Sequence, residues 1–132
     1  MAGDTQLTDE GGPLSHGRKV YKHNGTCIGI AGTYTDCMRF MKWYRGGMKE
    51  PLKKVGDVSA LLLSAEGNIF YFDGDAQSYK VTDKFMAIGS GASAAMGAMH
   101  MGATPAQAVK IASKVDTYTG GRITTRTITR GN

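Results

Sequence analysis

Hydrophobic and polar positions alternate in short runs through the first two thirds of the chain, and this pattern predicts antiparallel strands joined by tight turns. The clearest runs are residues 18–23, 26–32, 58–65 and 69–72. Asn24-Gly25 separates the first two runs and Glu66-Gly67-Asn68 separates the last two. Asn-Gly favours a two-residue hairpin turn because both positions tolerate positive φ. We therefore expect two hairpins here.

Three other segments have the period of a helix. Residues 34–46 place apolar side chains on one face, and Gly46-Gly47 ends the pattern. Residues 92–101 form a run of small residues. Thr104-Pro105-Ala106-Gln107 is a helix start, with Thr as the N-cap, Pro at the first helical position and Gln closing a capping box. That helix is expected to reach about Thr117.

The remaining segments read as loops and short strands. A short strand at the start is followed by a loop over residues 5–17, and residues 49–57 form a basic connector. Short strands are predicted at Tyr79–Val81, Phe85–Ile88 and Arg122–Arg130. Hairpins with helices grouped between them favour α+β layers over a βαβ repeat, in one domain spanning residues 1–132.

Composition narrows the class of protein. The chain is 41% hydrophobic and 20% charged, with a net charge of +5, which is typical of a globular domain. Cys27 and Cys37 lie in apolar surroundings and are expected to be buried free thiols, which favours the reducing cytoplasm. No signal peptide and no bilayer-spanning run is visible. His16, His23 and His100 lack ligand spacing, so we predict no metal and no cofactor.

Four short motifs carry polar residues that are candidates for a site. They are Ala2-Gly3-Asp4, Ile30-Ala31-Gly32 with Asp36 four residues on, Ile88-Gly89-Ser90-Gly91, and Asp116-Thr117-Tyr118-Thr119-Gly120-Gly121. Each candidate residue also has a structural explanation. Asp4 could be a loop or cap residue, and Lys19 a solvated strand lysine. Gly32 could end a strand, and Ser90 could be an N-cap. Asp116 near a helix C-terminus needs a partner, for which a lysine or backbone donors could serve.

In this order and context the motifs resemble those of the proteasome β-subunits and their bacterial heat-shock relative, which are N-terminal-nucleophile hydrolases. The resemblance implies a layered αββα sandwich and a threonine-type peptidase site. Residue by residue, it assigns the supporting carboxylate to Asp4, the catalytic lysine to Lys19, the oxyanion glycine to Gly32, the serine near the threonine amine to Ser90, and the last motif's polar pair to Asp116 and Thr119, with Thr119 in place of a serine.

The chain departs from the family pattern in two places. The family's nucleophile is a threonine at the mature N-terminus, one strand before the Ala-Gly-Asp motif, whereas this sequence begins with Met1 almost on that motif. Residues 46–57 stand where the family has a second long helix. We therefore expect a reduced sandwich that lacks the first strand and one helix.

Three functions remain open from the sequence. The first is a proteasome-like self-assembling protein that is inactive as given because the nucleophile is absent. The second is an active threonine peptidase whose true N-terminal segment precedes Met1. The third is an assembly or scaffold protein without enzymatic activity. A basic nucleic-acid-associated module is a weaker alternative.

The expected partner is the protein itself in a homo-oligomeric ring, and the resemblance also implies an ATPase unfoldase. No membrane partner is expected. Arg122, Arg126 and Arg130 share one face of the predicted last strand. Because no aromatic side chain accompanies them, we expect this face to meet solvent or a neighbour's acidic groups rather than nucleic acid.

Overall fold

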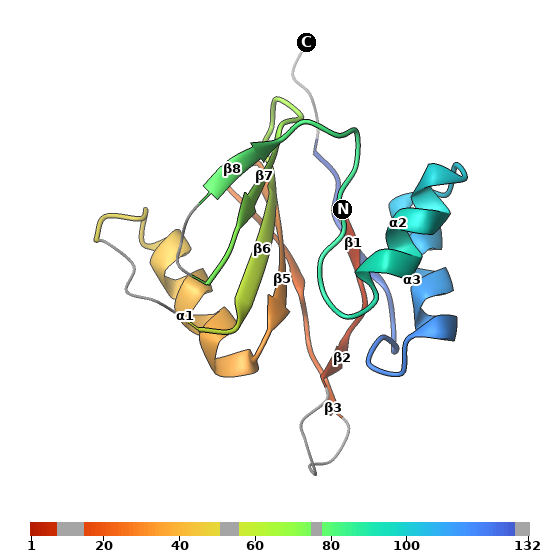
Figure 1. Cartoon of the computed structure of the whole chain (residues 1–132). Helices are drawn as coiled ribbons and strands as arrows, with labels where there is room; N and C mark the ends of the chain where they lie inside the picture. The colour runs from red at the N-terminus through yellow and green to blue at the C-terminus, as the bar shows by residue number, and fades with distance from the viewer. Residues whose placement is uncertain (8–14, 51–55, 75–77, 129–132) are drawn as a thin grey trace.

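A five-stranded antiparallel sheet forms the centre of the computed structural model, which describes residues 1–7, 15–50, 56–74 and 78–128 (Figure 1). Neighbouring strands follow the chain order β4-β5-β6-β7-β8. Their bounds are β4 Val20–His23, β5 Thr26–Gly32, β6 Val58–Leu63, β7 Ile69–Phe72 and β8 Ser78–Val81. Both hairpins predicted from the alternating pattern are therefore confirmed.

Turn chemistry and a long ladder fix the register of this sheet. His23 pairs with Thr26 across Asn24 and Gly25, whose φ angles of 49° and 79° are the positive values that a two-residue hairpin needs. β5 and β6 pair continuously from Cys27 with Leu63 to Gly32 with Val58. This register places alternate residues of β5 and β6 on the same two faces.

Helix α1, Tyr34–Arg45, covers one face of the sheet and ends at Gly46. Its buried side chains Cys37, Phe40 and Met41 pack against the sheet residues Ile28, Ile30, Val58, Ala60, Leu62 and Phe72. The ring centroids of Phe40 and Phe72 lie 5.6 Å apart in an edge-on contact. This cluster is the main hydrophobic core.

The opposite face of the sheet looks toward a second, smaller group of elements (Figure 1). β1 Ala2–Gly3 pairs with β9 Thr124–Thr125, and β2 Gln6–Leu7 pairs with β3 Ser15–His16. Outside β1 lie α2 Ala92–His100 and α3 Pro105–Val115, which pack together through Ala95, Met99, Ala108 and Ala112. The capping box of Thr104 and Gln107 starts α3 as predicted.

The layers run from α1 through the large sheet and the short β1–β9 pair to α2 and α3, so the predicted α+β, reduced αββα arrangement is confirmed.

Some elements differ from the sequence predictions. Residues 85–88 form no ladder with the rest of the described residues, so the strand pattern has no hydrogen-bonding neighbour among them. The final strand comprises two residues, since it is as long as its partner β1. The predicted loop over residues 5–17 contains the β2–β3 pair, although residues 8–14 lie outside the described part. Residues 51–55 of the connector, and Arg130, also lie outside it.

Candidate active site

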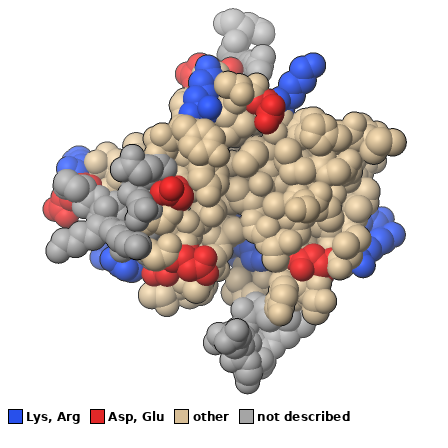
Figure 2. Space-filling view, in the orientation of Figure 1, with Lys and Arg blue, Asp and Glu red and all other residues tan. Residues whose placement is uncertain are grey.

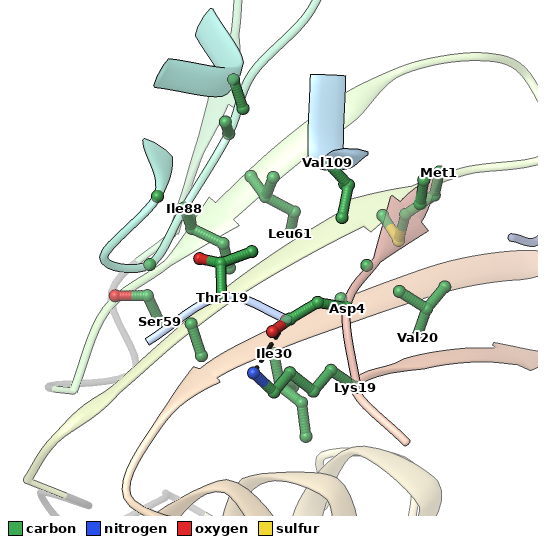
Figure 3. A pocket seen from close by; sticks show the side chains of 18 of the residues that line it. Met1, Asp4, Lys19, Val20, Ile30, Ser59, Leu61, Ile88, Val109 and Thr119 are labelled. Atoms are coloured by element: carbon green, nitrogen blue, oxygen red, sulfur yellow. Dashed lines mark hydrogen bonds and ion pairs between the residues drawn. The ribbon is translucent and has the colours of Figure 1, made fainter. Parts of the chain in front are cut away.

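A cleft of about 1340 Å³ lies between the face of the large sheet opposite α1 and the layer of β1 and α3. Apolar side chains from both layers line it, among them Leu61 and Ile69 from the sheet and Ile88 and Val109 from the other side. The polar side chains Asp4, Lys19, Ser90 and Thr119 line the same cleft, and Figure 3 shows Asp4, Lys19 and Thr119 together beneath the apolar groups.

Lys19 and Asp4 form an ion pair at the floor of this cleft (Figure 3). Lys19 Nζ donates to Asp4 Oδ1 at 2.8 Å, and the backbone N–H of Gly120 donates to Asp4 Oδ2 at 2.9 Å. Asp4 is 9% exposed and the Lys19 side chain 24%. Both carboxylate oxygens of this buried acid are thus satisfied, as burial of a charge requires. The predicted contact is present, and Lys19 is not a solvated strand lysine.

Close packing of β1 on the sheet brings these two residues together. A Cβ at Gly3 would lie 2.6 Å from Val20 Cγ2, so no larger residue fits there without movement. Asp4 follows directly after β1 and Lys19 directly precedes β4. The glycine of Ala-Gly-Asp therefore has a packing role, which explains its place beside the acid.

A second polar cluster joins the loop before α2 to the end of α3. Ser90 Oγ donates to Asp116 Oδ2 at 2.5 Å, and Thr119 Oγ1 donates to the same oxygen at 2.6 Å. These hydrogen bonds, Ser90 first, hold the pKa of Asp116 below its usual value, with smaller contributions from the Tyr118 backbone and the charge of Lys19. Hydroxyl groups are therefore the main partners of Asp116.

The alternative of Ser90 as a helix cap is wrong. Gly91 is the N-cap of α2, and no side chain caps this helix. A Cβ at Gly91 would lie 2.7 Å from Thr119 Oγ1, so the glycine allows the close approach of the two loops. Ser90 is consequently free of a capping role and directed to Asp116.

Gly32 ends β5 with φ of 132°, a backbone conformation that favours glycine, and a Cβ there would overlap the carbonyl oxygen of Asp57. Asp36 fixes the turn that follows. Its Oδ2 accepts from Thr33 Oγ1 at 2.8 Å and from the Asp57 backbone N–H at 3.0 Å. The Thr33 bond is the main reason that the pKa of Asp36 is lowered. Gly32 lines the cleft, whereas Asp36 stabilises the turn after β5 and does not line the cleft.

The structure brings most of the predicted site residues to one place. Asp4, Lys19, Gly32, Ser90 and Thr119 line the cleft, and Asp116 is bound to two hydroxyl groups of this region. A hydroxyl or amine group placed beside Lys19 would experience its positive charge, which favours the deprotonated, nucleophilic form. The α-amine of Met1 donates instead to the carbonyl oxygen of Arg126 at 2.9 Å.

Sequence reasoning missed one member of this site, the Gly120 backbone N–H that binds Asp4. The Gly120-Gly121 pair was a visible signal, but only the fold shows which acid it meets.

Cys27 and Cys37 are buried free thiols as predicted, and burial raises the pKa of Cys37 to about 11. Among the described residues, no three His, Cys, Asp or Glu side chains converge as metal ligands. None of the described helices has the length and apolar character needed to cross a bilayer.

No protein-family model and no curated protein matches the sequence. Solved structures do match. Eukaryotic HslV from Trypanosoma brucei is similar with a TM-score of 0.74 and 21% identity, over 93% of this chain and 88% of that chain. Thiobacillus denitrificans BPH is similar with a TM-score of 0.74 and 17% identity, over the same shares of both chains.

A second structure of Thiobacillus denitrificans BPH, in complex with epoxomicin, is similar with a TM-score of 0.73 and 17% identity over those shares. At these identities the likeness concerns the fold, and it agrees with the fold that the four motifs implied. The chain therefore has the fold of the HslV and BPH structures across nearly its whole length.

Proposed function

We propose that this protein is a proteasome-like, self-assembling N-terminal-nucleophile hydrolase whose residues 1–132 supply the groups that support a nucleophile but not the nucleophile itself. The observation that carries the proposal is the Lys19–Asp4 ion pair, which lies in the same cleft as the hydroxyl groups of Ser90 and Thr119. A lysine held in position by a buried acid is the arrangement that a threonine-type peptidase needs.

Each residue has a role in this proposal. Lys19 lowers the pKa of a nearby hydroxyl through its charge, and Asp4 positions Lys19. Ser90, Asp116 and Thr119 form the polar wall that faces the terminal amine, which takes the proton from the nucleophile. The backbone N–H of Gly32 stabilises the oxyanion that forms on the attacked peptide carbonyl.

The cleft offers a place for the segment that would carry the nucleophile. Ala2 and Gly3 of β1 line it, as do residues 85–88. β1 pairs with β9, while residues 85–88 have a strand-like sequence and no ladder partner in the described part of the chain. A strand inserted between them would complete the second sheet. The second function from the sequence analysis, a peptidase with an upstream segment, is thus compatible with this geometry.

The N-terminus of the protein in its natural source tests the proposal. Intact-mass analysis and N-terminal sequencing should be combined with a peptidase assay and with epoxomicin as probe. A polypeptide of residues 1–132 is expected to show no turnover and no adduct. A natural form that begins with threonine one strand earlier is expected to turn over peptides, and Lys19→Ala should abolish this.

Two results would contradict these roles. Turnover by residues 1–132 that survives Lys19→Ala would show that the cleft is not the site. A threonine-initiated form that folds but neither turns over peptides nor reacts with epoxomicin would favour the scaffold function instead.

Self-assembly is supported by an exposed apolar surface. Figure 2 shows few charged side chains over the half of the molecule that contains α2 and α3. Met101 is 89% exposed, Val115 73% and Tyr118 59%. Contiguous exposed apolar surface is typical of interaction sites. Light scattering should show an oligomer, and a monomer at micromolar concentration would count against assembly.

The ring arrangement and an ATPase unfoldase as partner follow from the resemblance, and co-purification from the natural source tests both. The two buried thiols fit a reducing compartment, for which we propose the cytoplasm. Arg122 is exposed and Arg126 Nη1 donates to the neighbouring Thr125 carbonyl oxygen, in keeping with a solvent-facing or subunit-facing role.

A further inference from the structure

Strand β1 has one backbone edge that its neighbour β9 does not use. Met1 and Arg126 exchange both of their backbone hydrogen bonds, each with an N···O distance of 2.9 Å. The next residue, Ala2, lies opposite Thr125. Because bonded and non-bonded pairs alternate along an antiparallel ladder, the N–H and C=O groups of Ala2 point away from β9. In the described part of the chain, the sheet that contains β1 has only these two strands, so no strand adjoins this edge there.

The packing of β1 and β9 shows where this edge points. β1 lies over the β4 and β5 side of the large sheet: Gly3 packs against β4, and a Cβ built at Gly29 of β5 would lie 3.2 Å from the Met1 sulfur. β9 lies toward β4, because Lys22 Nζ of β4 donates to the Thr127 carbonyl oxygen at 2.9 Å, two residues beyond β9. The unused edge of β1 therefore points toward the part of the cleft that lies over β6 and β7.

This part of the cleft, which we call the strand lane, has apolar walls. Leu61 of β6 and Ile69 of β7 line it from the large sheet, and Val109 of α3 also lines the cleft (Figure 3). The cleft volume of about 1340 Å³ exceeds the roughly 300–1,000 Å³ of a small-molecule pocket. A strand that is covered on both faces carries apolar side chains on both. The lane therefore has the lining and the size that suit an extended apolar chain.

We propose that the strand lane binds an extended, uncharged peptide segment of a separate chain, which pairs with Ala2 as an added strand. The inference rests on the proposed function, because it names a partner for the same cleft. One residue of the segment exchanges both backbone hydrogen bonds with Ala2, and the neighbouring apolar side chains fill the lane. The second sheet is then completed by another chain, with no need for a longer N-terminal segment.

Hydrogen bonding and charge both favour a peptide strand over other ligands of the lane. Ala2 presents one donor and one acceptor side by side, and a lipid or hydrocarbon would leave both without a partner. A charged polymer would lose its hydration against the aliphatic walls. Lys19 and Asp4 neutralise each other at the floor of the cleft, so this pair adds no net charge that would attract such a polymer. An uncharged extended chain is the ligand that matches both properties.

Binding of synthetic peptides to residues 1–132 tests the inference without requiring turnover. Fluorescence anisotropy should follow a short labelled peptide of alternating valine and alanine, flanked by serines for solubility. This valine–alanine peptide is expected to bind saturably below about 1 mM. An N-methylated version keeps the side chains but cannot donate to the Ala2 carbonyl oxygen, and an aspartate version replaces the central valine. Both versions are expected to bind at least about tenfold more weakly.

Two proline variants test the edge itself. Ala2→Pro removes the N–H group that faces the lane, at an edge position where proline is tolerated, and should weaken binding of the valine–alanine peptide about tenfold. Thr125→Pro is the matched control, because Thr125 belongs to the same cross-strand pair and its N–H points to the opposite edge. It should leave the affinity within about twofold. Circular dichroism melts show whether each variant is folded, and the N-methylated peptide tests the same hydrogen bonding on the parent protein.

Three results would overturn the inference. They are a lack of saturable binding below about 1 mM, equal affinity for the valine–alanine peptide and either modified version, or equal effects of Ala2→Pro and Thr125→Pro. The proposed function is judged separately. A natural threonine-initiated form that cleaves peptides, together with no strand binding by residues 1–132, leaves that function standing while this inference fails. Strand binding by residues 1–132, together with a threonine-initiated form that shows no turnover, does the reverse.

Discussion

Replacing Asp4 by asparagine keeps the size of the side chain but removes the charge that pairs with Lys19. The parent contacts are a 2.8 Å ion pair with Lys19 and a 2.9 Å hydrogen bond from Gly120. Hydrogen bonds to charged groups contribute about 1.5–3 kcal/mol. Breaking a fully buried pair costs about 3–5 kcal/mol. Since Lys19 keeps 24% exposure and water can partly solvate it, we expect the free energy of unfolding to fall by about 2 kcal/mol.

Urea unfolding at neutral pH is the assay. A loss of about 2 kcal/mol should lower the urea midpoint by about 1 M while the slope of the transition stays the same. Glu66→Gln is the control, because Glu66 is an exposed turn residue outside the ion pairs of the described residues. Its stability should change by less than about 0.5 kcal/mol.

A double-mutant cycle separates this pair from other effects. Lys19→Met retains the apolar stem, and the coupling energy between Asp4→Asn and Lys19→Met should be at least about 1 kcal/mol. A coupling energy near zero would refute the reasoning, since it would mean that each residue is stabilised by something other than its partner.

Three further predictions concern particular residues. Gly32→Ala should lower the free energy of unfolding by more than about 3 kcal/mol or prevent folding, because glycine is needed at φ of 132°. Gly97→Ala is the control: a Cβ there meets nothing within 4 Å, and the change should stabilise α2 by about 0.5–1 kcal/mol. Equal effects of the two variants in urea unfolding would contradict the need for glycine at position 32. The Cys37 thiol, with its pKa raised to about 11, should react with a thiol reagent at pH 8 only after unfolding, and rapid labelling of the native protein would show that it is accessible. The pKa of Asp116 is lowered mainly by its hydrogen bond from Ser90, so this group contributes stability that is present above its unfolded pKa and lost as the pH falls through its folded pKa. Ser90→Ala should therefore raise the folded pKa of Asp116 in an NMR titration. An unchanged pKa would show that the Ser90 hydrogen bond does not lower it.

Local physics made much of the secondary structure predictable. Alternation, Asn24-Gly25 and the capping box at Thr104 act between residues close in sequence, and the strands and helices they predicted are present. The strand predicted at residues 85–88 is absent because strand formation also depends on contacts between residues far apart in the chain. Its pattern is local, but a strand requires a neighbour, and the chain brings no ladder partner to it among the described residues.

In the candidate site, too, some features follow from the sequence and others only from the tertiary structure. The sequence by itself determined which residue types are available, a carboxylate at Asp4, a lysine at Lys19 and hydroxyls at Ser90 and Thr119, and their order suggested a fold. Only the tertiary structure decided their partners: that Asp4 also binds the Gly120 N–H, and that Ser90 meets Asp116 rather than capping α2. These contacts join residues far apart in the chain, and no local pattern encodes a distance that depends on how two packed layers approach each other.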